Sequence, residues 1–172
     1  MKKYNFDNSQ KGENGTVLII GGSKLYTGAA FFSANAAFIC GVDMIYVFTA
    51  DEAIIPLKIL LPEAIISPIE YQEWILKRIN VCILGPGLGK LHQKTLKIIK
   101  NILKFLNDLL IPIILDGDGI RCYEDLEISS YQNIIFTPNF KEATYISNLN
   151  TGQYLLKKGK IDEIYSNKFK KT

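Results

Sequence analysis

Histidine, cysteine and long apolar runs are scarce in this chain, and each scarcity excludes a class of protein. The 172 residues contain one histidine, His92, so chemistry that depends on a histidine dyad or triad is not expected. The three cysteines, Cys40, Cys82 and Cys122, form no CxxC pair and lie in or beside apolar stretches, which predicts buried, reduced thiols. No run approaches the ~20 apolar residues of a membrane span, and residues 1–15 lack the apolar centre of a secretory signal. We therefore expect a cytoplasmic protein without a membrane partner.

A strong charge of one sign is also absent. Lysine and arginine number 20, aspartate and glutamate 17, and the net charge of +3 is spread along the chain. A dedicated nucleic-acid binder would concentrate its basic residues on one face. The exception is the tail, residues 166–172, where Lys168, Lys170 and Lys171 stand without acids. This tail is predicted to be solvated, with contact to nucleic-acid phosphates as the alternative.

The length predicts one domain over residues 1–172, preceded by an extension at 1–14, since domains average about 150 residues. Apolar runs alternate with helical patterns. Strands are predicted at 16–22, 44–48, 64–67, 81–85, 112–115 and 133–136, and helices at 28–41, 50–60 (interrupted or begun near Pro56), 71–79 and 92–107. Near-continuous apolar strands that alternate with helices indicate an α/β fold with a mostly parallel sheet covered on both faces.

Polar and glycine residues follow four of the predicted strands. These segments are Gly21-Gly22-Ser23, GPGLG at 85–89, DGDG at 116–119 and TPN at 137–139. Parallel α/β sheets bind ligands at the carboxyl ends of their strands. The sequence therefore predicts that these four loops form one site.

Taken singly, the motifs leave alternatives open. GPGLG is neither a Walker A loop nor a Rossmann fingerprint, so it either offers backbone N–H groups to an anion or is a tight turn that binds nothing. Asp116 or Asp118 could position magnesium or a ligand hydroxyl, or cap the following helix. His92 is interpreted as a solvated residue at a helix start, and no metal-ligating cluster is visible.

The order and spacing of longer segments are more specific. The informative segments are residues 17–68, 83–90, 114–120 and 135–146. With YTGA at 26–29, PEAIISP at 62–68 and TPNxxE at 137–142, they resemble the ATP- or ADP-dependent NAD(P)H-hydrate dehydratases of the ribokinase-like superfamily. The resemblance covers residues 15–165, and implies a ribokinase-like three-layer α/β/α fold that is shortened at the C-terminus.

The resemblance also implies an activity. In that family ATP, with Mg2+, phosphorylates the hydroxyl of hydrated NADH or NADPH, and elimination of phosphate restores the reduced nicotinamide. The substrate-binding positions it implies are Gly85, Gly87, Gly89, Asn139, Phe140, Lys141, Glu142 and Tyr145. The nucleotide-binding KGxxD motif maps onto Lys158, Gly159 and Asp162. A lysine after a strand neutralises phosphate charge and a glycine lets the backbone turn, although Lys158 alone would fit an ordinary surface hairpin.

Two departures from the family pattern limit this expectation. The stretch between TPN and Lys158 is shorter than in the family, and residues 163–172 contain no glycine-rich loop ending in Gly-Asp. That loop carries the aspartate expected as general base, so the catalytic residue stays unassigned and catalysis is predicted to be impaired. A shortened sheet also leaves an apolar face or edge bare, which predicts a protein partner or assembly covering it. The alternatives are a non-catalytic module of a larger assembly, such as a ribonucleoprotein, and a small-molecule kinase of the same superfamily.

Overall fold

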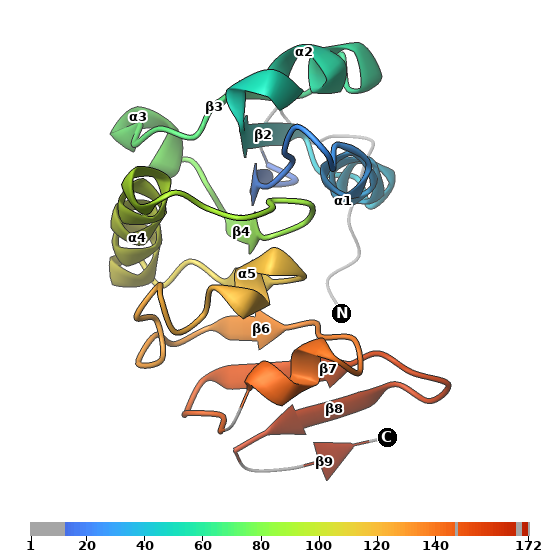
Figure 1. The fold of residues 1–172 in the computed structure, drawn as a ribbon, viewed down its shortest axis with the longest axis vertical. Coiled ribbons are helices and arrows are strands. Elements are labelled where there is room, and N and C mark those ends of the chain that lie inside the picture. Colours follow the sequence, from blue (N-terminus) through green and yellow to red (C-terminus); the bar gives the residue numbers. More distant parts are fainter. Residues whose placement is uncertain (1–12, 147, 168–169, 172) are drawn as a thin grey trace.

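In the computed structural model, which describes residues 13–146, 148–167 and 170–171, the strands form a single sheet (Figure 1). The order across it is β3-β2-β1-β4-β5-β6-β7-β8-β9. The strands are β1 (Thr16–Ile20), β2 (Met44–Thr49), β3 (Ile65–Pro68), β4 (Val81–Leu84), β5 (Ile113–Leu115), β6 (Ile134–Phe136), β7 (Gln153–Lys157), β8 (Glu163–Ser166) and β9 (Lys170–Lys171). The neighbours from β3 to β7 pair in parallel, whereas β8 and β9 pair antiparallel. The mostly parallel α/β sheet expected from the apolar runs is confirmed.

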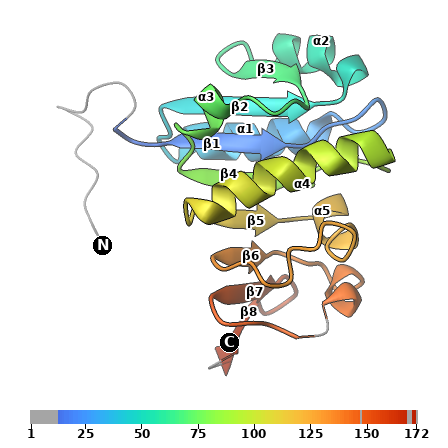
Figure 2. The same ribbon diagram turned by 90° about the vertical axis from the view of Figure 1, so that its left-hand side faces the viewer.

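Helices lie on both sides of the first strands (Figure 2). The helices are α1 (Gly28–Ile39), α2 (Asp51–Leu60), α3 (Glu73–Leu76), α4 (Gln93–Asp108), α5 (Asp118–Arg121) and the 3-10 turn η1 (Glu142–Tyr145). Helices α1 and α2 pack on one face, and α3 and α4 on the other. The apolar stripe of α4, with Ile99 and Leu103 fully buried, explains how it attaches to the sheet while its lysines face outward. The short α5 and η1 lie at the carboxyl ends of the strands (Figure 2).

Alternation along the strands divides the interior into two cores. On β1, Val17 and Ile19 join the core under α1 and α2, and Leu18 and Ile20 join the core under α3 and α4. Successive side chains point to opposite faces of a sheet, so a continuous apolar run is what a strand covered on both sides requires.

Beyond β4 only one face of the sheet is covered within the described residues. On β5 and β6 the residues facing α4 are fully buried, as for Ile113 and Ile134, whereas their neighbours Ile114 and Ile135 join neither core. Tyr154 and Ile164, farther along the same face, are 43% and 41% exposed. We call this surface the apolar sheet face; it consists of Ile114, Ile135, Tyr154, Leu156 and Ile164.

Several predicted elements differ in detail. Helix α2 begins at Asp51 and runs through Pro56 without interruption, since burial of Ala53 and Leu57 outweighs the one backbone hydrogen bond that proline cannot make. The helix predicted at 71–79 forms only over Glu73–Leu76. The turn η1, α5 and the antiparallel strands β8 and β9 were not among the predicted elements.

The thiols are not all buried. Cys40 is exposed where α1 ends, so its predicted burial is wrong, because α1 presses onto the sheet through Ala30 and Ala34 and its last residue lies away from that contact. Cys82 is buried in β4, and burial raises the pKa of its thiol far above the ordinary value. Desolvation also raises the pKa of the half-buried Cys122. No helix within the described ranges has both the length and the apolarity needed to cross a bilayer.

Candidate functional site

The strand order reverses between β1 and β4, which places the loops after these two strands side by side. From β1 the chain goes outward to β2 and β3, and from β4 it goes outward in the other direction to β5 and β6. Such a switch point is where open α/β sheets form ligand crevices. The Gly22 amide donates to the Pro86 carbonyl at 2.9 Å, so the loops 21–23 and 85–89 are in direct contact. This contact confirms that the first two predicted loops meet.

The glycines of GPGLG allow this loop to pack against other backbone. Gly85 has φ +115°, and a Cβ there would overlap the Asp116 carbonyl and the backbone of Gly119. A Cβ on Gly87, with φ +64°, would lie 2.6 Å from the Tyr26 carbonyl oxygen. What approaches these two glycines in the structure is therefore the neighbouring loops. Their contact with substrate stays a prediction.

Asp116 brings three of the predicted motifs together. One carboxylate oxygen, Oδ1, accepts hydrogen bonds from Lys158 Nζ at 2.8 Å and from Thr137 Oγ1 at 2.9 Å. The three residues follow β5, β6 and β7, and Lys158 is 42 residues away from Asp116 in the chain. The Lys158 side chain is 47% exposed, so the ion pair lies at the surface of the site.

Asp118 joins the DGDG loop to GPGLG. Its Oδ2 accepts the Gly89 amide at 2.8 Å, and its Oδ1 accepts from Arg121 at 3.2 Å. The alternative that one of these aspartates caps the following helix is wrong, because the N-cap of α5 is Gly117 and the helix has no side-chain cap. The described residues contain no group of three or more histidine, cysteine or acidic side chains placed to hold a metal ion.

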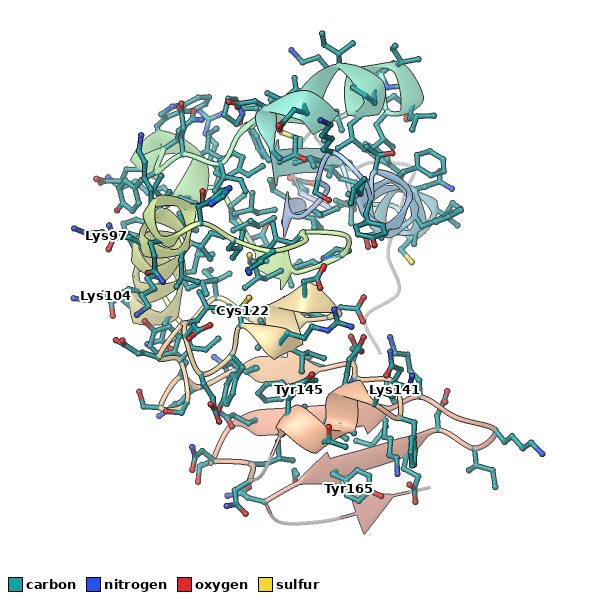
Figure 3. All side chains as sticks on the ribbon, viewed as in Figure 1. Lys97, Lys104, Cys122, Lys141, Tyr145 and Tyr165 are labelled. Atoms are coloured by element: carbon teal, nitrogen blue, oxygen red, sulfur yellow. The ribbon has the colours of Figure 1, made fainter. Side chains whose placement is uncertain are left out.

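The TPN loop is held by a reciprocal pair of hydrogen bonds. The Asn139 side chain accepts the Glu142 amide at 2.9 Å, and the Glu142 carboxylate accepts the Asn139 amide at 3.0 Å. This reciprocal arrangement has the pattern of a capping box and closes the turn just before η1, whose own N-cap, Lys141, makes no side-chain cap hydrogen bond. Glu142 is 8% exposed, in keeping with that structural role. Phe140 and Tyr145 are exposed, and Figure 3 shows Tyr145 and Lys141 at η1, over the end of the sheet.

The KGxxD motif forms the loop of the β7–β8 hairpin. The Gly159 amide donates to the Asp162 carboxylate at 3.1 Å, which fixes the turn, and the Lys158 amide donates to the Pro138 carbonyl at 3.2 Å. Lys158 does lie at an exposed hairpin, the setting given as the alternative for this lysine, and its ammonium contacts Asp116. The nucleotide contacts of the motif stay a prediction.

Two cavities open at the strand ends. The first, called the Asp116 cavity, has a volume of about 660 Å3 and is bordered by Pro86, Gly87, Asp116, Asp118, Arg121 and Glu142, among others. The second, called the Lys90 cavity, has a volume of about 680 Å3 and is bordered by Asp51, Glu52, Leu88, Gly89, Lys90 and Lys94, among others. Leu25 and Tyr26 border both. His92, exposed at the start of α4 as expected, also borders the Lys90 cavity.

Some residues of the site were not predicted. Tyr26 borders both cavities and Arg121 binds Asp118, but neither was among the predicted site residues. Thr137 belongs to a loop that was predicted to join the site, but its contact with Asp116 was not predicted. The YTGA segment that contains Tyr26 was the available signal. Of the residues predicted to contact substrate, Gly87 and Glu142 border the Asp116 cavity and Gly89 borders the Lys90 cavity. The other five border neither cavity: Gly85, Asn139, Phe140, Lys141 and Tyr145.

Known proteins resemble this chain in both sequence and structure. Three curated relatives share the name ATP-dependent (S)-NAD(P)H-hydrate dehydratase. The one from Heterostelium pallidum is 36% identical over 148 residues, covering 80% of this chain and 35% of the relative. The one from Drosophila pseudoobscura pseudoobscura is 34% identical over 177 residues, 90% of this chain and 58% of the relative. The one from Danio rerio is 38% identical over 144 residues, 78% of this chain and 43% of the relative. The chain thus spans roughly one third to three fifths of these relatives.

A ribokinase-like superfamily protein from Enterococcus faecalis superposes with a TM-score of 0.81 at 25% identity, covering 95% of this chain and 64% of its own. The ADP/ATP-dependent NAD(P)H-hydrate dehydratase of Bacillus subtilis, co-crystallised with ATP and Mg2+, gives a TM-score of 0.71 at 18% identity, covering 96% and 65%. These neighbours confirm the ribokinase-like fold. The family model described as NAD(P)H-hydrate dehydratase matches residues 17–169. Since this match includes all four strand-end loops and most of the chain, the protein belongs to the NAD(P)H-hydrate dehydratase family.

Proposed function

We propose that this chain provides the substrate and nucleotide sites of an ATP-dependent NAD(P)H-hydrate dehydratase. In this reaction ATP phosphorylates the hydroxyl of hydrated NADH or NADPH, and elimination of phosphate restores the reduced nicotinamide. The observation that carries the proposal is the convergence of Asp116, Thr137 and Lys158 from three strand ends onto one point beside a cavity. The names of the curated relatives support the substrates and the phosphoryl donor.

Lys158 is the group proposed to face the ATP phosphates. An ammonium has three donors, and Asp116 uses one of them, so the half-exposed Lys158 retains donors for a phosphate. Asp162 fixes the turn at Gly159, which holds the lysine at the strand end. Mg2+ is usually held by phosphates together with one or two carboxylates. Asp116 fits as one such ligand, because it borders the cavity and is about one-third exposed.

We also propose that these 172 residues by themselves catalyse phosphoryl transfer slowly. Phosphoryl transfer depends on positioned donors and a base. Residues 163–172 contain no glycine-rich loop ending in Gly-Asp. Loss of a donor loop costs ~10²–10³ in rate and loss of a positioned base a further ~10²–10⁴. Asp116 is proposed above to face Lys158 and Mg2+, and both Asp118 oxygens accept hydrogen bonds, from Gly89 and Arg121, so neither aspartate is proposed as that base.

An assay with hydrated NADH tests this proposal. The purified chain is incubated with ATP, magnesium and hydrated NADH while the absorbance of reduced nicotinamide is followed. We expect tight substrate binding with turnover far below that of a full-length relative assayed in parallel. Turnover equal to the relative's would contradict the impaired chemistry, and no binding of either ligand would contradict the assignment of the sites.

A second candidate function is a non-catalytic module in a larger assembly, and the apolar sheet face favours it. Parallel sheets are ordinarily covered on both faces, and contiguous exposed apolar patches mark interaction sites. We propose that a separate helical polypeptide covers Ile114, Ile135 and Tyr154. A monodisperse, soluble monomer in light scattering would contradict this. The predicted nucleic-acid contact of the tail stays a prediction, and Lys168 lies outside the described residues.

A further inference from the structure

We propose that a second copy of this chain packs on the outer face of helix α1, about a two-fold axis. This outer face consists of Ala29, Phe32, Ala36 and Ile39, all of them exposed. Ala29 and Phe32 also border the Asp116 cavity, whereas Ala36 and Ile39 border neither cavity, so the surface extends beyond the candidate site. The inference is independent of the proposed reaction.

The outer face of α1 lies opposite the face that packs on the sheet. Ala30 and Ala34 are fully buried on the sheet side. Because an α-helix has about 3.6 residues per turn, the four residues of the outer face lie on the other side of the helix. They are spaced three, four and three residues apart, which is the repeat by which two helices pair along a seam. Helix α1 therefore has two apolar faces, and within the described residues only one of them is covered.

No charged side chain lies on α1. The polar side chains of the helix are Ser33 and Asn35, and the Ser33 hydroxyl already donates to a carbonyl of the preceding turn at 3.0 Å. The other long helix, α4, is different, since Figure 3 shows Lys97 and Lys104 on its outer side. A helix exposed to water ordinarily has charged or polar residues opposite its buried face. The outer face of α1 instead has the composition of a contact surface.

Two large side chains project from this face. Phe32 is 68% exposed and Ile39 is 78% exposed. The Phe32 ring packs edge to face with Phe31, at 5.3 Å between ring centroids, and Phe31 packs against the core under α1 and α2. Phe32 is thus supported from below in its exposed position. A supported aromatic side chain is a typical anchor of a protein interface, because its burial costs little conformational entropy.

The order of large and small side chains fits a second copy of the same helix. In an antiparallel pair with its two-fold axis at the level of residue 34, Phe32 lies at the level of the partner's Ala36. Ala29 then lies at the level of the partner's Ile39. Each large side chain meets a small one, as interdigitated packing requires. An uncharged face also meets no like charge in its own copy, whereas a charged partner would find no opposite charge there.

The contact area predicts a weak dimer. A helix of 12 residues is about 18 Å long and about 10 Å wide, so its contact is smaller than the ~800 Å2 that each partner buries in a standard interface. Interfaces below the standard size form transient complexes. We therefore expect a monomer–dimer equilibrium that shifts toward the dimer as the protein concentration rises.

Sedimentation equilibrium over a wide range of protein concentrations tests this inference. Phe32→Lys and Ala36→Glu should each raise the dissociation constant of the dimer about tenfold or more, because a charge is buried without a partner. An equal mixture of these two variants should form a heterodimer more tightly than either variant pairs with itself, since one lysine then faces one glutamate. Ile161→Lys is the matched control, because Ile161 is 71% exposed on the β7–β8 hairpin and should leave the wild-type dimer unchanged.

Three results would overturn the inference. The first is a wild-type chain that stays monomeric at every concentration. The second is a dimer that neither Phe32→Lys nor Ala36→Glu weakens, which would place the association on another surface. The third is a mixture of the two variants that pairs no better than each alone, which would contradict the antiparallel register. Circular dichroism is expected to show the same fold in every variant, because all three substituted residues are exposed.

Discussion

The two halves of the sheet differ in how they are covered, and one row of isoleucines shows it. Ile19 on β1 and Ile83 on β4 pack under α1 and α2, while Ile114 and Ile135, the next residues in the same row, join no core. The strand sequences are similarly apolar in both halves. Apolar strands alone therefore do not determine which faces are covered, since the helices that follow them must also be present.

The cavities follow the same division. The Lys90 cavity is bordered by loops of the half that is covered on both faces, and the Asp116 cavity reaches the half covered on one. The loop interactions that join the halves, at Gly85, Asp116 and Asp118, are consequently the interactions on which the geometry of the site depends.

The largest expected effect is a difference in the free energy of unfolding between matched isoleucine variants in the two halves of the sheet. Ile19→Ala should lower the free energy of unfolding by about 2–5 kcal/mol, because Ile19 is fully buried. Ile135→Ala, in the same row of the same face, should cost about 1 kcal/mol or less. Urea denaturation of both variants measures the contrast. Equal losses would show that the apolar sheet face is covered in solution.

The second prediction concerns the stability cost of replacing Gly85, which lies where the two halves of the sheet meet. Gly85→Ala should cost about 1–3 kcal/mol from its positive φ, with more from the overlap with Asp116 and Gly119. Gly28→Ala is the matched control, because a Cβ there meets nothing within 4 Å. Thermal unfolding compares the two, and a Gly85→Ala variant as stable as Gly28→Ala would contradict the packing of the loops.

The smallest effect concerns the half covered on one face. Glu142→Ala should remove the capping box and cost about 1 kcal/mol, whereas Glu142→Gln should retain most of it, because glutamine can also accept the Asn139 amide. The rate of hydrogen exchange at the Asn139 amide measures whether this amide is still hydrogen-bonded in each variant. Equally fast exchange in both variants would mean that the carboxylate has a role other than capping.

The sequence predicted strands and helices correctly wherever a local apolar pattern determines the structure. Apolar runs marked β1, β2 and β4 because a doubly covered strand is apolar at every position, and the stripe of Ile99 and Leu103 marked α4. The sequence predicted poorly those features that depend on packing between segments far apart in the chain. Pro56 lies within a helix that tertiary packing maintains, and Cys40 is exposed because it follows α1 beyond the residues, Ala30 and Ala34, that pack on the sheet.

The same limit applies to the candidate site. The glycines of GPGLG were expected to let something come close, yet no sequence pattern distinguishes a ligand from the Asp116 backbone that approaches Gly85. The contact between Asp116 and Lys158, which are 42 residues apart, likewise depends on the order of β5, β6 and β7 in the sheet.

The most direct test of the account is an isothermal titration with ATP and Mg2+, since its central claim is that the strand-end loops form a site for phosphates at Lys158. Lys158→Ala should weaken ATP binding about tenfold or more, because a charge-assisted contact with phosphate is lost. Lys160→Ala, an exposed lysine two residues farther along the same hairpin, should bind ATP as the wild type does. Equal affinity in the wild type and both variants would contradict the claim.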